Sequence, residues 1–229
     1  MPGLCSKFNN TNMIQPLQYI SQTPKTGTHI DAIEQVLRAG GKWIQLRIKN
    51  QAEAEILPFA KAGQALCESY GAKLIINDYP HLAKAVNSYG VHLGLQDMPI
   101  PEARKIIGKQ QIIGGTANTF AHIQQRVAEG ADYIGLGPFR FTRTKENLSP
   151  IVGLEGYGRL MEKVKKAGIK TPIIAIGGIE AADIPAILET GIYGIAISAA
   201  LTNQTQTAAV LEEINSKFNI HSISKLKIC

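Results

Sequence analysis

Cysteines are few in this sequence, and their placement excludes a disulfide scaffold. The chain has three, Cys5, Cys67 and Cys229, which are odd in number and far apart. Neither the paired spacing of a zinc site nor the close pair of a redox motif is present. We therefore expect reduced thiols, without a disulfide framework and without a zinc centre.

Long apolar runs are also lacking. No stretch approaches the roughly 20 apolar residues that a membrane-spanning helix needs, and the first residues of the chain contain no uninterrupted apolar segment of the secretory kind. These absences predict a cytoplasmic protein that makes no contact with a membrane. Low-complexity linkers are missing as well, so we expect residues 1–229 to form one domain.

The charge is moderate and is not arranged for nucleic acid. The chain has 24 Lys and Arg against 18 Asp and Glu, a formal net charge of +6. Such a balance admits nucleic acid or small anions as partners. The basic residues are not interleaved with aromatic ones as they are in surfaces that bind single strands. We expect small anionic substrates and no nucleic acid, while a homo-oligomer stays open.

Short apolar runs rich in Ile, Leu and Val recur along the chain. They are nearly continuous rather than alternating, which is typical of parallel strands buried on both faces. The runs are 17–21, 43–47, 73–77, 90–94, 111–115, 133–137, 172–177 and 194–198.

A helix-like segment follows each run, and several of these segments stop at a glycine. They are 29–39, 52–70, 81–88, 101–107, 119–129, 154–167, 181–189 and 205–218. Strict alternation predicts an α/β fold, a single closed TIM (β/α)8 barrel. Its core would span about 14–218, with short extensions at both ends. The competing open doubly wound sheet lacks a GxGxxG after its first strand.

Two consecutive runs lead into an aspartate, Asp78 after LIIN and Asp97 after GVHLGLQ. Neighbouring parallel strands lie about 4.8 Å apart and their following loops open on one side. The two carboxylates would therefore face the same ion. Magnesium takes oxygen ligands, often one or two protein carboxylates plus waters and substrate phosphates. The alternative is that each aspartate, close before a proline, caps a helix; the repetition favours magnesium.

Polar residues with a period of two end the second run. Gln45, Arg47 and Lys49 would point to one face, where they suit an anion. Arginine offers a bidentate fork to phosphate oxygens and lysine a point charge, so the pair fits a diphosphate. The alternative is that Arg47 and Lys49 only reach solvent.

Hydroxyls, a cation and glycines follow the later runs. Thr142, Thr144 and Lys145 lie in a long loop that is either a lid or a solvated surface loop. Gly177 and Gly178 follow the seventh run, and loops after strands 7 and 8 often form a phosphate site in barrels. A Gly-Gly pair is equally consistent with a tight turn.

Single polar residues also end other runs. Ser198 ends the eighth run, and Asn77 and Thr116 would hydrogen-bond a ligand or only finish their strands. His92 lies between Val91 and Leu93, where a hydrogen-bonded core histidine with a secondary contact is the preferred interpretation.

The order and spacing of these motifs, from about Leu17 to Leu201, resemble the thiamine-phosphate synthase family. The motifs are QLRIK at 45–49, ND at 77–78, GVHLG at 90–94 with Asp97, IGGT at 113–116, TRTK at 142–145 and AIGGI at 175–179. The resemblance implies a transferase that joins hydroxymethylpyrimidine diphosphate to hydroxyethylthiazole phosphate, or to its carboxylated form. The products are thiamine phosphate and pyrophosphate, and the substitution is dissociative and assisted by magnesium.

The resemblance also implies roles for particular residues. Magnesium would be bound by Asp78 and Asp97. Catalytic roles would belong to Arg47, Lys49 and Lys145, the last neutralising the leaving pyrophosphate. The pyrimidine diphosphate would be held by Gln45, Arg47, Lys49, Asn77 and Thr116. The thiazole phosphate would be held by Thr142, Thr144, Gly177, Gly178, Ile197 and Ser198.

The sequence departs from the family pattern at two positions. Thr116 stands where the family usually has serine, and Leu95 stands where a polar residue is common. The nearest rival function is thiazole tautomerase, an isomerase on the same barrel that has little need for a diphosphate site. A second rival is a barrel that binds a phosphate ligand without catalysis.

Overall fold

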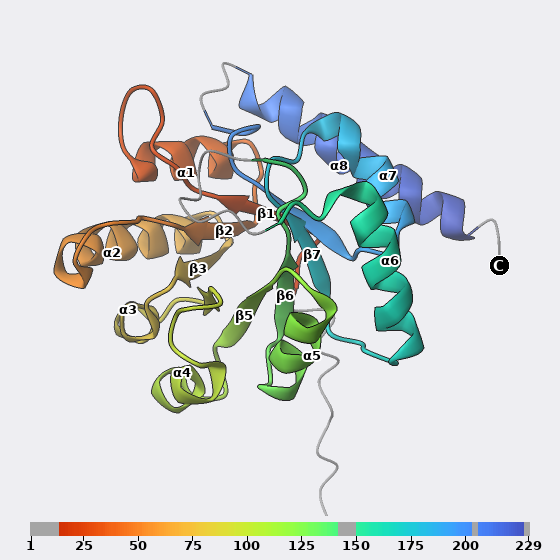
Figure 1. Ribbon diagram of the computed structural model, residues 1–229. Coiled ribbons are helices and arrows are strands. Elements are labelled where there is room, and N and C mark those ends of the chain that lie inside the picture. The colour runs from red at the N-terminus through yellow and green to blue at the C-terminus, as the bar shows by residue number, and fades with distance from the viewer. Residues whose placement is uncertain (1–13, 142–149, 203–205, 227–229) are drawn as a thin grey trace, which may run out of the picture.

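The computed structural model describes residues 14–141, 150–202 and 206–226, with side chains described up to residue 221. All neighbouring strands are parallel and close into a barrel in the order β1 to β8, which the helices surround (Figure 1). The strands are β1 (Leu17–Ile20), β2 (Trp43–Leu46), β3 (Lys73–Asn77), β4 (Gly90–Leu93), β5 (Ile112–Ala117), β6 (Tyr133–Leu136), β7 (Ile173–Ile176) and β8 (Gly194–Ile197).

The helices alternate with these strands along the chain. They are α1 (His29–Arg38), α2 (Glu53–Ser69), α3 (Pro80–Ala85), α4 (Ile100–Ile107), α5 (Phe120–Ala128), α6 (Gly153–Lys166), α7 (Ile184–Glu189), preceded by the short 3-10 helix η2 (Ala181–Asp183), and α8 (Thr207–Leu226). Among the described helices, none combines the length and apolar character of a membrane span.

The pairing of the first strand with the last confirms the predicted barrel. In the β1 and β8 pair, Leu17 lies opposite Ile195 and Tyr19 opposite Ile197. An open doubly wound sheet would leave both strands as edges. The predicted end of the last helix is wrong, because α8 continues past Phe218 to Leu226. The added residues contain neither glycine nor proline, so no local signal stops the helix there.

The apolar strands divide their side chains between two cores. Ile44 and Leu46 of β2 pack outward against the helices. Trp43 of the same strand lies inside the barrel with Tyr133 of β6. This division explains why the strand sequences are apolar almost throughout, since both faces are covered. Nearer the carboxyl ends of β2 to β5, the inward positions are polar, and the site begins there.

Candidate active site

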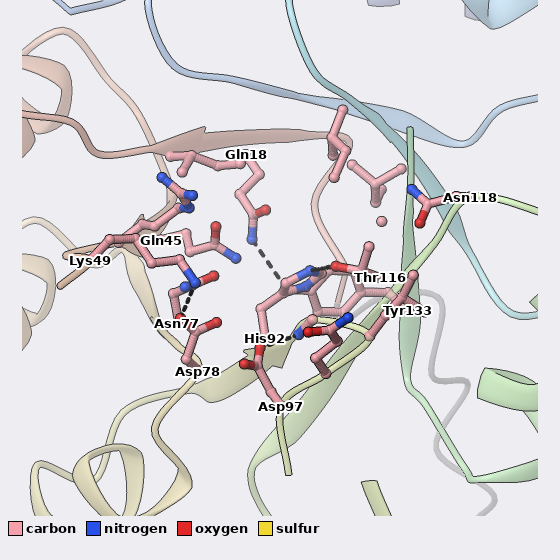
Figure 2. Close-up of a pocket in the computed structure, with 18 of the residues that line it drawn as sticks. Gln18, Gln45, Lys49, Asn77, Asp78, His92, Asp97, Thr116, Asn118 and Tyr133 are labelled. Atoms are coloured by element: carbon pink, nitrogen blue, oxygen red, sulfur yellow. Dashed lines mark hydrogen bonds and ion pairs between the residues drawn. The ribbon is translucent and has the colours of Figure 1, made fainter. Parts of the chain in front are cut away.

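Two cavities lie at the carboxyl end of the barrel. The first, of about 460 Å³, is lined mainly by residues from the ends of β1 to β6 and the loops that follow (Figure 2). The second, of about 370 Å³, lies over the ends of β1, β7 and β8. Arg47 lines both cavities. One side chain can therefore contact two ligands bound side by side.

Most of the residues predicted from the sequence line these cavities. The first cavity brings together Gln45, Arg47, Lys49, Asn77, Asp78, Asp97 and Thr116. The second brings together Arg47, Gly177, Gly178 and Ser198. Ile197 is 1% exposed and its side chain packs in the outer core, so only its backbone can face a ligand. Thr142, Thr144 and Lys145 lie outside the described residues.

Asp78 and Asp97 form an acidic pair in the first cavity. Figure 2 shows their side chains near each other, with Lys49 beside Asp78, and Lys49 Nζ donates to the Asp78 carboxylate. Burial and the neighbouring Asp97 carboxylate raise the pKa of Asp78 to about 6, against the opposing effect of Lys49. A shared proton or a cation relieves such a pair of close carboxylates. Neither residue is the N-cap of its helix, since Tyr79 and Pro99 occupy those positions.

The backbone aims both carboxylates into the cavity. Asp78 has φ +69, in the left-handed region that Asp tolerates better than most residues. Its N–H donates to the carbonyl oxygen of His92 at 2.8 Å, so β4 holds it in that conformation. Asp97 accepts from the Gly94 N–H at 2.5 Å. A Cβ on Gly94 would lie 2.7 Å from Asp97 Oδ2, so a side chain at this position would displace the Asp97 carboxylate.

The donor set fits magnesium. Among the described residues there is no cluster of three or more His, Cys, Asp or Glu side chains that could enclose a metal. Two carboxylates are enough for magnesium, because waters and substrate phosphates commonly complete its octahedron. The buried Asn77 Nδ2 in the same cavity has no hydrogen-bond partner, although such groups are normally paired. A bound phosphate oxygen would accept from it.

The raised pKa of Asp78 predicts how the stability of the metal-free chain depends on pH. Between the ordinary value of 3.8 and about 6, the folded chain binds more protons at this carboxyl than the unfolded chain does. Its contribution to stability is therefore full below the lower value and is lost as the pH rises through about 6. We expect Asp78→Asn to flatten this part of the pH dependence, measured as thermal unfolding without magnesium. An unchanged profile in the variant would contradict the assigned pKa.

The three residues at the end of β2 become more exposed toward the mouth of the cavity. Gln45 is buried and Arg47 half-buried, while the Lys49 side chain is 43% exposed. The Arg47 N–H donates to Ser21 Oγ at 3.1 Å, which ties this strand end to the end of β1. Burial lowers the pKa of His29, and the positive charge of Arg47 lowers it further. Because Arg47 and Lys49 place positive charge at this mouth of the barrel, it is suited to an anion.

Backbone turns and an arginine shape the second cavity. Gly177 and Gly178 have φ +98 and +69, conformations that favour glycine. Arg140, from the loop after β6, donates to the Gly178 carbonyl and to both carboxylate oxygens of Asp183, each at 2.8 Å. Ser198 donates to Gln22 Oε1 at 3.2 Å. The result is a cradle of glycine turns and two serines, with Arg47 at its side and without a carboxylate pair.

Sequence reasoning missed several residues of this site. Gln18, Tyr133 and Asn118 line the first cavity, and Arg140 holds the second cradle. Gln18 carried the one available signal, because it is a polar residue at an inward position of an otherwise apolar strand. Tyr133 gave no signal, since an aromatic residue at the start of a strand is ordinary core. The contact of Arg140 depends on which loops the closed barrel brings together.

A parallel barrel whose carboxyl end holds an acidic pair, cations and a glycine cradle defines an enzyme that handles phosphorylated substrates. The family model for thiamine monophosphate synthase matches residues 17–201. The chain is 50% identical over 205 residues to the thiamine-phosphate synthase of Flavobacterium johnsoniae, covering 90% of this chain and 97% of that protein. It is 47% identical over 204 residues to that of Bacteroides fragilis, covering 89% and 98%.

A solved structure agrees with these relatives. The thiamine phosphate pyrophosphorylase from Pyrococcus furiosus superposes with a TM-score of 0.77 at 30% identity, covering 90% of this chain and 96% of that one. The chain belongs to the thiamine monophosphate synthase family. The family, the barrel fold and the transferase class predicted from the sequence are confirmed.

Proposed function

We propose that this chain joins a pyrimidine diphosphate in the first cavity to a thiazole phosphate in the second, with magnesium held by Asp78 and Asp97. The observation that carries the proposal is the position of Arg47 between the two cavities. One cavity has the acidic pair and the cations that a diphosphate with magnesium needs. The other offers glycine turns and two serines beside the same arginine, which suits a single phosphate.

The bond changes balance without a general base. The bond between the pyrimidine methylene carbon and the diphosphate oxygen breaks, and the diphosphate leaves with the electron pair. The lone pair of the thiazole nitrogen then forms the new carbon–nitrogen bond, which gives thiamine phosphate and pyrophosphate. Arg47 and Lys49 stabilise the negative charge that develops on the leaving group. Magnesium, when bound, supplies further positive charge to the diphosphate oxygens.

The remaining residues orient the two substrates. The buried Gln45 and Asn77 face the pyrimidine cavity together with Thr116. Gly177, Gly178 and Ser198 line the cradle for the thiazole phosphate, whereas the Ile197 side chain packs in the outer core. Roles for Thr142, Thr144 and Lys145 rest on the family resemblance, because these residues lie outside the described ranges.

A thiazole tautomerase is the second candidate, since it uses the same barrel for one substrate. The acidic pair disfavours it, because an isomerisation of the thiazole alone leaves Asp78, Asp97 and Lys49 without a ligand. A barrel that binds phosphate without catalysis is the third candidate. It has no need for a second cavity contacted by the same arginine.

A product assay separates these functions. We expect equal amounts of thiamine phosphate and pyrophosphate to form only when the pyrimidine diphosphate, the thiazole phosphate and magnesium are all present. Omission of each component in turn is the control. Isomerisation of the thiazole without thiamine phosphate would support the tautomerase. Binding of both substrates without any product would support the non-catalytic barrel.

A further inference from the structure

A chain of buried side chains forms the floor of the first cavity. Gln18 Nε2 donates to the Tyr133 hydroxyl at 3.4 Å, and this hydroxyl lies 3.1 Å from His92 Nδ1. His92 Nε2 lies 3.0 Å from Thr116 Oγ1. Figure 2 shows the four residues reaching toward one another from β1, β6, β4 and β5. Each of them also lines the cavity.

The neighbours of the Tyr133 hydroxyl decide which group its O–H donates to. Burial raises the pKa of the phenol and the charge of Asp132 adds to this, whereas the hydrogen bond from Gln18 acts in the opposite direction. A hydrogen bond that lowers the pKa of a phenol is one that its oxygen accepts. The Gln18 amide nitrogen can only donate to this oxygen, and the Tyr133 O–H has His92 Nδ1 within hydrogen-bond distance as an acceptor. The hydroxyl therefore donates to His92 Nδ1.

The hydrogen bond from Tyr133 determines which ring nitrogen of His92 carries the proton. A neutral imidazole that accepts at Nδ1 carries its proton on Nε2. His92 Nε2–H consequently donates to Thr116 Oγ1. Because that oxygen accepts from histidine, the Thr116 O–H is available to donate into the cavity. In the opposite tautomer, Thr116 would donate to His92 and could only accept from a ligand.

Packing holds the two rings in this arrangement. A Cβ on Gly135 would lie 3.0 Å from His92 Cε1, so any side chain there would crowd the imidazole. The Tyr133 ring lies edge-on to Trp43, with centroids 5.0 Å apart. Both His92 and Tyr133 are more than nine-tenths buried. The two rings are thus held in place before a ligand binds.

We propose that His92 is a positioning residue, held by Tyr133 with its proton on Nε2, which makes Thr116 a hydrogen-bond donor to a ring nitrogen of the pyrimidine substrate. This rests on the proposed function, because it takes the ligand of the first cavity to be the pyrimidine diphosphate. A substrate with an acceptor at this point is bound, and one that presents a donor there is rejected. The relay therefore fixes which edge of the heterocycle enters the floor of the cavity.

The tautomer is measured directly in the free protein. Side-chain nitrogen NMR at neutral pH, with the signals assigned through His92→Gln, should show His92 neutral and protonated at Nε2. In Tyr133→Phe the Nδ1 atom loses its donor, so the preference for the Nε2–H form should weaken. The matched control is Tyr157→Phe, which removes another buried hydroxyl, one that donates to the Leu136 carbonyl at 2.9 Å. It should leave the His92 signals unchanged.

Ligand binding gives the second measurement, which needs no turnover. In calorimetry with magnesium, Tyr133→Phe and Thr116→Val should each weaken binding of the pyrimidine diphosphate about tenfold. Inorganic pyrophosphate, which has no ring, should bind both variants and Tyr157→Phe within about twofold of the original chain. A purely structural role would instead weaken both ligands together.

Particular outcomes would overturn the proposal. These are an Nδ1–H or doubly protonated His92 in the original chain, or equal losses for the ring-bearing ligand in Tyr133→Phe and Tyr157→Phe. If Tyr133→Phe does not fold, the tautomer of the original chain and the Thr116→Val titrations decide alone. Failure to form thiamine phosphate would contradict the proposed function, whereas the NMR and calorimetry results would still test the role of His92.

Discussion

Asp78→Asn is expected to lower the magnesium-dependent kcat/KM by at least about a hundredfold, because the cation that neutralises the diphosphate loses one of two protein ligands. Asparagine suits this test, since it tolerates the φ of +69 found at position 78 and removes only the charge. Asp97→Asn should have an effect of the same order. The measurement is the initial rate as a function of magnesium concentration at saturating substrates.

A carboxylate at the other end of the barrel provides the control. Asp132 precedes β6 and accepts from Arg104 at 2.6 Å and from the Ile113 N–H at 2.8 Å. Asp132→Asn should lower the melting temperature while the magnesium dependence stays as in the original chain. If Asp78→Asn or Asp97→Asn responds to magnesium as the original chain does, the metal assignment is wrong.

Arg47→Ala is expected to lower kcat/KM by about a hundredfold to a thousandfold, and to raise the KM of both substrates. The first effect follows from the loss of a donor to the leaving diphosphate. The second follows because Arg47 lines both cavities. Arg47→Lys keeps the charge and loses the planar fork, so it should recover only part of the activity. Steady-state kinetics with each substrate varied in turn gives all three quantities.

An exposed arginine is the matched control for this variant. Arg159 on α6 has a side chain that is 71% exposed and pairs only loosely with Glu155 at 3.5 Å. Arg159→Ala should leave both KM values and kcat within about twofold, as is usual for a surface position. A fully active Arg47→Lys would show that charge alone is needed at position 47. A change in one KM only would place Arg47 in one cavity.

Much of the fold was predictable from local pattern. The eight apolar runs correspond to the eight strands within a few residues, because strands covered on both faces need apolar side chains throughout. The predicted last helix is too short, because α8 meets no stop residue after Phe218 and continues to Leu226. Glycine follows the other helices close to where expected, except that α3 ends at Ala85, before the predicted residue 88, where Asn87 adopts φ +51.

The candidate site was predictable where chemistry and strand ends coincide. Asp78, Asp97, Arg47 and Lys49 carry charge at the end of an apolar run, a position that only a loop or a site explains. The residues missed were of two kinds. Tyr133 is a core residue by composition, and its role depends on Gln18 and His92, which reach its hydroxyl across the barrel. Arg140 is one of many basic loop residues until Gly178 and Asp183 are beside it.

The sequence by itself determined the alternation of strands and helices, the charged strand ends and the glycine turns, because each depends on neighbours along the chain. Tertiary structure alone decided that Arg47 faces two cavities, that Asp97 and burial raise the pKa of Asp78 to about 6, and that His92 lies between Tyr133 and Thr116. Those properties arise from closure of the barrel, which brings together side chains far apart in the sequence and removes water from between them.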